Sequence, residues 1–321
     1  MPILVFLEKE GNNIRKSSLE AISYACAIAG KSQSTVTGVV LGDMDEGETS
    51  NAGLYGCDKI IHLSDPGFNQ PVISLYAEAL NTVMDKESSE FFITAQSALA
   101  DPIAAKIAIK QNASIATNVT DLPDMGEEFA LKRSIYSGKA YENIVLTSAK
   151  KVISIKKNSA GLIENEKAVK VEVSDLKPNP DKLDVQITGK DKSTGKILLP
   201  EADIVVSAGR GLKGPDNWSM VETLAEELGA AIGCSKPVSD AGWRPHHEHV
   251  GQTGIKVAPN LYIAIGISGA IQHLAGVSSS KVIVVINNDP EAPFFNNAEY
   301  GIVGDAFKVI PKLIDVIRKN K

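Results

Sequence analysis

Roughly the first 118 residues alternate between short apolar runs and longer segments with helical spacing. Runs rich in β-branched residues have the length of buried strands, whereas apolar residues at every third or fourth position form one face of a helix. The predicted strands are Ile3–Leu7, Ser34–Leu41, Lys59–Leu63 and Glu90–Thr94. The predicted helices are Ser17–Ala29, Pro71–Met84 and Asp101–Ile109. This alternation predicts a parallel α/β domain, to which we assign a scaffold or partner-binding role.

The pattern changes after about Thr120, where charged residues alternate with apolar ones. Three such segments, Lys132–Tyr136, Asn143–Leu146 and Lys151–Ile155, are predicted to be antiparallel or edge strands. The stretch from Lys156 to Glu172 and the following Lys177-Pro178-Asn179-Pro180 have the composition of a loop or linker. We therefore place a domain boundary near Lys190. The expected domains are residues 1–190, with a β extension from about 120, and residues 191–321.

A strand–turn–helix–strand unit stands out in the second half of the chain. Leu261–Ile267 and Lys281–Ile286 have the β-branched content of buried parallel strands. The turn Ser268-Gly269-Ala270-Ile271 between them is predicted to begin a helix, whose free N–H groups and positive dipole end favour an anion. Gln272 and His273 follow in the same first turn and add an amide and an imidazole. This combination suggests a phosphate-bearing cofactor with a polar ring system, although an ordinary strand–helix–strand unit also fits.

A second candidate turn follows the predicted strand Ala202–Ser207. Its residues Gly209 to Gly214 read G-x-G-x-x-G, but Pro215 postpones the helix to Trp218–Leu228, which fits the usual dinucleotide geometry poorly. A nicotinamide-dependent dehydrogenase would also need an acidic residue at the end of the next strand, where Ile232 leads into Cys234-Ser235-Lys236. Arg210 places a fixed cation at the same sheet edge as Ser268.

Composition narrows the classes of function. The chain has 321 residues, 43% of them hydrophobic, and a formal net charge of −6, so it lacks the basic surface that nucleic-acid binding requires. No apolar run approaches the ~20 residues of a membrane span, and the chain enters a strand at once. We expect a cytoplasmic protein without membrane insertion. The three cysteines are far apart in sequence and are expected to be reduced. No metal site is predicted, because His246, His247 and His249 lack a second ligand cluster.

Several motifs of the second half occur in a fixed order. They are GRGLK with Arg210, GCSKP with Ser235 and Lys236, VGQTG over Val250–Gly254, GISGAIQHLAG with Ser268–His273, INNDPEAP with Asn287, and YGIVGD over Tyr300–Asp305. In these motifs the chain closely resembles the alpha subunit of electron transfer flavoproteins. The resemblance is strongest from about Ile204 to Val309. It is colinear over the first domain, where SAKKVISI and RSIYSGKAYEN match family-like segments.

The resemblance implies a fold and an assembly. The fold would be an N-terminal parallel α/β domain of nucleotide-hydrolase-like type with a β extension, followed by a C-terminal doubly wound, Rossmann-like FAD-binding domain. The chain would form a heterodimer with a beta subunit that holds AMP. It would accept electrons from acyl-CoA dehydrogenases and other flavoprotein dehydrogenases in fatty acid β-oxidation. It would pass single electrons to electron transfer flavoprotein–quinone oxidoreductase, and would be a carrier and not an enzyme.

The resemblance also assigns residues. Ser268–His273 would hold the FAD phosphates and ribityl chain, with His273 near the pyrimidine carbonyl, and Thr253 would bond near the flavin N5. The remaining residues of the implied FAD site are Arg210, Ser235, Lys236, Val250, Gly251, Gln252, Asn287 and Asp305. His273, Lys236 and Thr253 are predicted to tune the redox potential, since a cation or donor stabilises the negative charge of a reduced flavin. Lys236 occupies a position at which the family usually has Arg. Lys keeps the positive charge but lacks the planar guanidinium group of Arg.

Two alternatives remain open at this point. A specialised or electron-bifurcating member of the same family would pair with a beta subunit that carries a second FAD. A nicotinamide-dependent dehydrogenase would instead use the Gly209–Gly214 turn.

Overall fold

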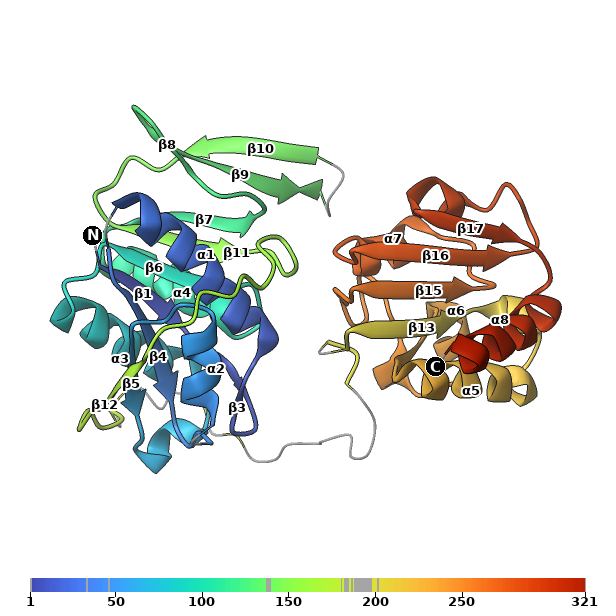
Figure 1. The fold of residues 1–321 in the computed structure, drawn as a ribbon, viewed down its shortest axis with the longest axis horizontal. Helices are drawn as coiled ribbons and strands as arrows, with labels where there is room; N and C mark the ends of the chain where they lie inside the picture. Colours follow the sequence, from blue (N-terminus) through green and yellow to red (C-terminus); the bar gives the residue numbers. More distant parts are fainter. Residues whose placement is uncertain are drawn as a thin grey trace. The chain divides into compact units, whose positions relative to one another are not determined.

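The computed structural model describes residues 2–32, 34–45, 47–136, 140–179, 181, 185, 187, 198–200 and 202–320 (Figure 1). Contacts within the chain divide it into two compact units, Met1–Lys190 and Asp191–Lys321. Each unit has its own sheet and its own hydrophobic core. Nowhere in the described ranges is a helix both long and apolar enough to cross a membrane.

The first unit is built on a parallel sheet. Within the described part of the unit, ten strands join in the order β10-β9-β7-β11-β6-β1-β4-β5-β12, with β8 paired to β9. The parallel strands are β1 (Ile3–Phe6), β4 (Val36–Leu41), β5 (Lys59–Leu63), β6 (Phe91–Ala95), β7 (Ser114–Val119), β11 (Lys151–Ile155) and β12 (Lys170–Val173). A small hairpin joins β2 (Lys9–Glu10) to β3 (Asn13–Ile14). The predicted parallel α/β domain is thus confirmed.

Helices cover both faces of this sheet. Alternation along β1 sends Ile3 and Val5 into one core cluster and Leu4 and Phe6 into the other, because successive strand residues point to opposite faces. The helices of the unit are α1 (Lys16–Ser32), α2 (Glu48–Leu54), α3 (Ile73–Lys86), α4 (Ala100–Lys110) and the 3-10 helix Pro66–Asn69. Residues of α1 pack in the first cluster, and those of α3 and α4 pack in the second.

The predicted β extension is confirmed only for part of its range. β8 (Asp124–Met125), β9 (Phe129–Ile135) and β10 (Ala140–Val145) are antiparallel strands at one edge of the sheet. The expectation for Lys151–Ile155 was wrong: β11 is parallel and lies between β6 and β7. Its residues after Lys151 are all buried, so the strand is central although it begins with a lysine.

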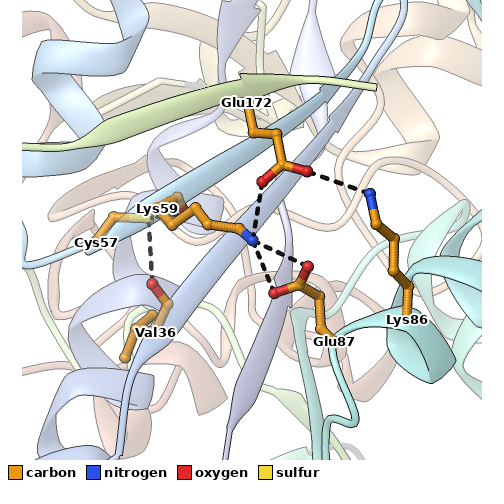
Figure 2. Close-up of polar contacts among 6 residues, drawn as sticks. All are labelled: Val36, Cys57, Lys59, Lys86, Glu87 and Glu172. Carbon is orange, nitrogen blue, oxygen red and sulfur yellow. Dashed lines mark hydrogen bonds and ion pairs between the residues drawn. The ribbon is translucent and has the colours of Figure 1, made fainter. Parts of the chain in front are cut away.

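The segment predicted as a loop or linker also contains a strand. β12 adds Lys170–Val173 to the edge of the sheet in parallel to β5. Lys59 on β5 lies 2.9 Å from Glu87 and 3.2 Å from Glu172 of β12, and Lys86 reaches the other oxygen of Glu172 (Figure 2). The sequence of β12 is charged and mostly exposed, so it did not predict a strand. The strand forms by pairing with β5, which is far away in the chain.

The second unit is a parallel sheet in the order β14-β13-β15-β16-β17. Its strands are β13 (Ile204–Ala208), β14 (Ala231–Cys234), β15 (Leu261–Ile265), β16 (Val282–Asn287) and β17 (Tyr300–Val303). Its helices are α5 (Ser219–Leu228), α6 (Lys236–Asp240), α7 (Ile271–Val277) and α8 (Ala306–Asn320), with short 3-10 helices at Arg210–Leu212, Pro215–Trp218, His246–Glu248 and Pro293–Asn297.

Both faces of the second sheet are covered, as the doubly wound prediction requires. Val221 of α5 and Ile310 of α8 pack on one face with Val206. Val277 of α7 and Phe294 pack on the other. The predicted doubly wound α/β fold is confirmed. The first connection runs from β13 to β14 on one side, and the chain then crosses to β15 on the other side of β13.

Candidate functional site

A cavity of about 490 Å³ lies at the carboxyl ends of β13, β14 and β15. Strand order reverses between β13 and β15, and the crevice at such a switch point is where open α/β sheets bind ligands. The volume is within the range of small-molecule sites, about 300–1,000 Å³. The lining residues are Arg210, Ser235, Lys236, Pro237, His249, Val250, Gly251, Gln252, Thr253, Gly266, Ile267, Ser268, Ala270, Gln272 and His273.

Glycines bring the turns around the cavity into close contact. Gly266 has a φ of +57° and directly follows β15. A Cβ atom at position 211 would lie 2.6 Å from the Gly266 Cα, and one at position 209 would overlap the Gly266 carbonyl oxygen. The first two glycines of the G-x-G-x-x-G match therefore serve backbone packing. α5 begins only at Ser219, after the 3-10 helix Pro215–Trp218, as the sequence predicted.

The loop Val250–Gly254 is fastened to α7. The Gln252 N–H donates to the Gln272 carbonyl at 2.7 Å, and the Val257 N–H donates to the Gly276 carbonyl at 2.8 Å. A Cβ atom on Gly276 would lie 2.5 Å from the Gly251 Cα, so these two backbones touch. The loop Val250–Gly254 and the start of α7 thus form one wall of the cavity.

His273 is the most buried titratable group of the predicted site, with 6% of its surface exposed. Its Nε2 lies 2.8 Å from the Tyr262 hydroxyl, and its ring centroid lies 5.7 Å from that of Phe294. Burial, with a smaller contribution from the nearby His249, lowers the pKa of His273 to about 4, while the Val250 backbone acts in the opposite direction. The imidazole is consequently neutral at physiological pH, so it acts as a hydrogen-bonding group and not as a cation.

The cations of the cavity are exposed. Lys236 begins α6, and its side chain is 59% exposed, with Asp240 at 3.9 Å. Arg210 begins a 3-10 helix after β13 and is also exposed. Charges that face water interact weakly with their neighbours because solvent screens them. Their contribution to a ligand is therefore modest unless the ligand covers them.

Sequence reasoning missed two residues of this region. His249 is only 2% exposed, lines the cavity and has an Nδ1 atom without a hydrogen-bond partner in the described structure. Burial first, then His246 and Lys236, lower its pKa, while Asp240 raises it. Tyr262 is fully buried beneath His273. In the sequence, nothing distinguished His249 from His246 and His247, and Tyr262 looked like one more apolar residue of a strand.

Four of the predicted site residues do not line the cavity. Gly269 has a φ of +87° and packs against the Phe294 backbone, and Ile271 is 61% exposed. The Asn287 amide donates to the Ile267 carbonyl at 3.0 Å, whereas the Asp305 side chain accepts from the Phe307 N–H at the start of α8. The other predicted residues lie together in the cavity wall: Arg210, Ser235, Lys236, Val250, Gly251, Gln252, Thr253, Ser268, Ala270, Gln272 and His273.

The boundaries of the predicted turn also change. β15 ends at Ile265 and α7 begins at Ile271, so an extended turn of several residues separates strand and helix. Ser268 and Ala270 belong to this turn and line the cavity, and α7 itself has seven residues. As for metals, the described residues contain no group of three side chains suited to hold an ion.

Fold and site together define a doubly wound α/β domain with a ligand cavity at its switch point, a class that binds nucleotide cofactors. Residues 198–278 match the electron transfer flavoprotein FAD-binding domain, and residues 3–181 match the electron transfer flavoprotein domain. The chain belongs to the family of electron transfer flavoprotein alpha subunits, which are electron carriers.

Similar proteins span nearly the whole chain. The chain is 34% identical over 319 residues to the electron transfer flavoprotein subunit alpha of Bacillus subtilis, covering 99% of this chain and 97% of that protein. It is 36% identical over 322 residues to the same subunit of Syntrophomonas wolfei, with 98% of each chain covered. It is 34% identical to the mitochondrial subunit of Oryza sativa subsp. japonica, covering 99% of this chain and 91% of that one.

Proposed function

We propose that this chain is the FAD-carrying alpha subunit of a heterodimeric electron transfer flavoprotein. It would accept electrons from flavoprotein dehydrogenases of the acyl-CoA dehydrogenase type and deliver them one at a time to a quinone-reducing acceptor. The observation that carries this proposal is the cavity at the switch point of the second sheet, most of whose lining residues belong to the segment that matches an FAD-binding domain.

The residues of the cavity fit such a cofactor. Glycines at positions 209, 211 and 266 pack backbone against backbone, so the turns after β13 and β15 meet beside the cavity without side chains between them. Arg210 and Lys236 supply positive charge for phosphates or for a reduced ring. The buried imidazole of His273 has an Nδ1 atom without a partner among the described residues, and a buried polar atom of this kind is normally satisfied by a ligand or water.

Roles can be assigned to the chain's own side chains. Bound FAD would supply the one-electron chemistry. Ser268, Ala270 and Arg210 would hold its phosphates, and Gln252, Thr253 and His273 would bond to its ring system. Asn287 and Asp305 would act indirectly, since Asn287 fixes the carbonyl of Ile267 and Asp305 caps α8. These groups bind, orient and stabilise charge, which is the work of a carrier and not of an enzyme that transforms a substrate.

Counting nucleotides tests the proposal. The chain is co-expressed with its beta subunit, the complex is purified, and the released nucleotides are quantified per heterodimer. One FAD and one AMP are expected, with AMP held by the beta subunit. Two FAD and no AMP would assign the chain to a specialised or electron-bifurcating member of the family, and a complex without FAD would contradict the proposal.

A further inference from the structure

Beneath the cavity wall lies a pair of buried aromatic residues. Tyr262, on the central strand β15, is fully buried, and its hydroxyl lies 2.8 Å from Nε2 of His273. We propose that Tyr262 is a positioning residue: its hydroxyl donates to His273 Nε2, keeps the proton of the imidazole on Nδ1, and thereby makes Nδ1–H the group that the chain offers to an acceptor atom of the cofactor ring. This inference rests on the proposed function.

Packing leaves the two rings little freedom. The Tyr262 ring is stacked on Phe294 at 6.4 Å and 23°, and the His273 ring meets the same Phe294 edge-on at 66°. β15 is held by β13 on one side and β16 on the other, so the phenol cannot withdraw without disturbing the sheet. Tyr262, on the central strand β15, therefore fixes the orientation of the His273 imidazole, and functional groups that must be placed precisely are generally supported by such rigid elements.

The direction of the hydrogen bond follows from counting protons. Burial raises the pKa of Tyr262, so the phenol keeps its proton. The hydroxyl bonds to His273 and also interacts with the buried side chain of Ser207, which lowers the pKa of the phenol and therefore donates to its oxygen. The phenol proton is then left for Nε2 of His273. An imidazole nitrogen accepts better than a phenol oxygen. Because a buried donor without a partner is costly, the phenol donates, Nε2 accepts, and the neutral ring carries its proton on Nδ1.

Nδ1 is then the unsatisfied donor of the pair. Among the described residues no group meets the distance and angle of a hydrogen bond to Nδ1, although the Val250 backbone is close enough to raise the pKa of the ring, and His273 lines the cavity. Without the Tyr262 hydroxyl, the ring would exchange between its two tautomers, and only a fraction of molecules would present a donor on Nδ1. A ligand that needs this donor would bind more weakly, because only that fraction is competent to bind it.

The test combines a tautomer measurement with a binding measurement. The full chain labelled with 15N-histidine is studied by long-range 1H–15N NMR, and His273→Gln identifies the His273 signals. In the unsubstituted chain, Nδ1 is expected to show a protonated and Nε2 an unprotonated nitrogen shift. Tyr262→Phe, which removes only the hydroxyl, should mix the two tautomers and weaken FAD binding by the heterodimer about three- to tenfold. Tyr24→Phe is the matched control, because it removes another buried hydroxyl whose bond, to the Asp121 carbonyl at 3.0 Å, lies in the first unit.

Each outcome decides the question. A proton on Nε2 in the unsubstituted chain would overturn the inference, even if Tyr262→Phe did not fold. An unchanged tautomer in Tyr262→Phe would overturn it as well. The NMR measurement needs no cofactor, so a heterodimer that binds no FAD would contradict the proposed function while leaving the tautomer result to be judged by itself.

Discussion

The polar residues that line the cavity differ in their exposure to solvent. Lys236 and Arg210 are exposed cations at the rim of the cavity. His273 and His249 are buried imidazoles, and burial lowers the pKa of each below its ordinary value. An exposed charge is screened but always present, while a buried imidazole provides a directed hydrogen bond without charge. Tuning of a bound cofactor should therefore be divided between weak electrostatic effects of the rim and specific hydrogen bonds from the buried wall.

Lys236 gives the first prediction at this scale. Removing its charge in Lys236→Ala should lower the reduction potential of the bound cofactor, because a nearby cation favours the added negative charge. Its 59% side-chain exposure limits the effect to about 0.3–1 kcal/mol, or roughly 10–40 mV for one electron. Lys236→Arg should keep the potential within experimental error. Spectroelectrochemical titration of the heterodimer measures both variants, and an equal shift in the two would show that charge is not the cause.

His273 gives a prediction on pH. Its folded pKa of about 4 lies below the ordinary value of 6.5, so the unfolded chain binds more protons between these values. The contribution of His273 to stability is complete above pH 6.5 and is lost as pH falls toward 4, by about 2 kcal/mol at pH 5. Urea unfolding at pH 7.5 and pH 5 should show a smaller pH difference in His273→Gln than in the unsubstituted chain. His247→Gln, at an exposed position, should leave the difference unchanged, and an equal pH response in His273→Gln would contradict the burial argument.

At the scale of elements, how well sequence alone predicts the structure depends on where each element gets its stability. Strands with an apolar, β-branched sequence, such as β5 and β13, were predicted closely because burial on both faces dictates their composition. β12 was missed because its strand character comes from pairing with β5 and from Glu172 bonding to Lys59. Asn287 and Asp305 were likewise predicted as site residues from their motifs. In the structure their side chains bond to backbone groups outside the cavity lining, and a sequence motif does not show such a contact.

The loop before His249 gives a prediction for an element. Arg244 bonds Glu248 at 2.6 and 2.9 Å, bonds Glu222 of α5 at 2.7 Å, and lies over the Trp218 ring at 4.9 Å. Because Glu248 is only 4% exposed, Arg244→Met would remove two charge-assisted hydrogen bonds from a buried carboxylate and should destabilise the second unit by about 3 kcal/mol. The free energy of unfolding in urea measures this.

A double variant and a surface variant serve as controls for that prediction. Arg244→Met combined with Glu248→Leu should recover part of the loss, since the buried carboxylate is removed together with its cation. Arg318→Met breaks a pair with Glu227 in which the arginine is 54% exposed, and should change stability by less than about 1 kcal/mol. A loss in Arg244→Met no larger than in Arg318→Met would contradict a structural role for the buried pair.

At the scale of the whole molecule, the chain consists of two units that each cover both faces of a parallel-dominated sheet. All residues that line the cavity come from the second unit. The first unit has its own hydrophobic cores. Among the described residues, the candidate cofactor site is therefore built by the second unit.

The final prediction concerns the chain without its partner. A cavity of about 490 Å³ with exposed Arg210 and Lys236 at its rim would cover part of an extended FAD, whereas tight sites bury about 70–90% of a ligand's surface. Expressed without the beta subunit, the chain should therefore lose most of its FAD during gel filtration, and should unfold at a lower temperature because bound ligand no longer stabilises it. The heterodimer, passed over the same column at the same concentration, should retain it. Flavin absorbance relative to protein in the eluted peak measures both, and a yellow monomer with stoichiometric FAD would contradict the prediction.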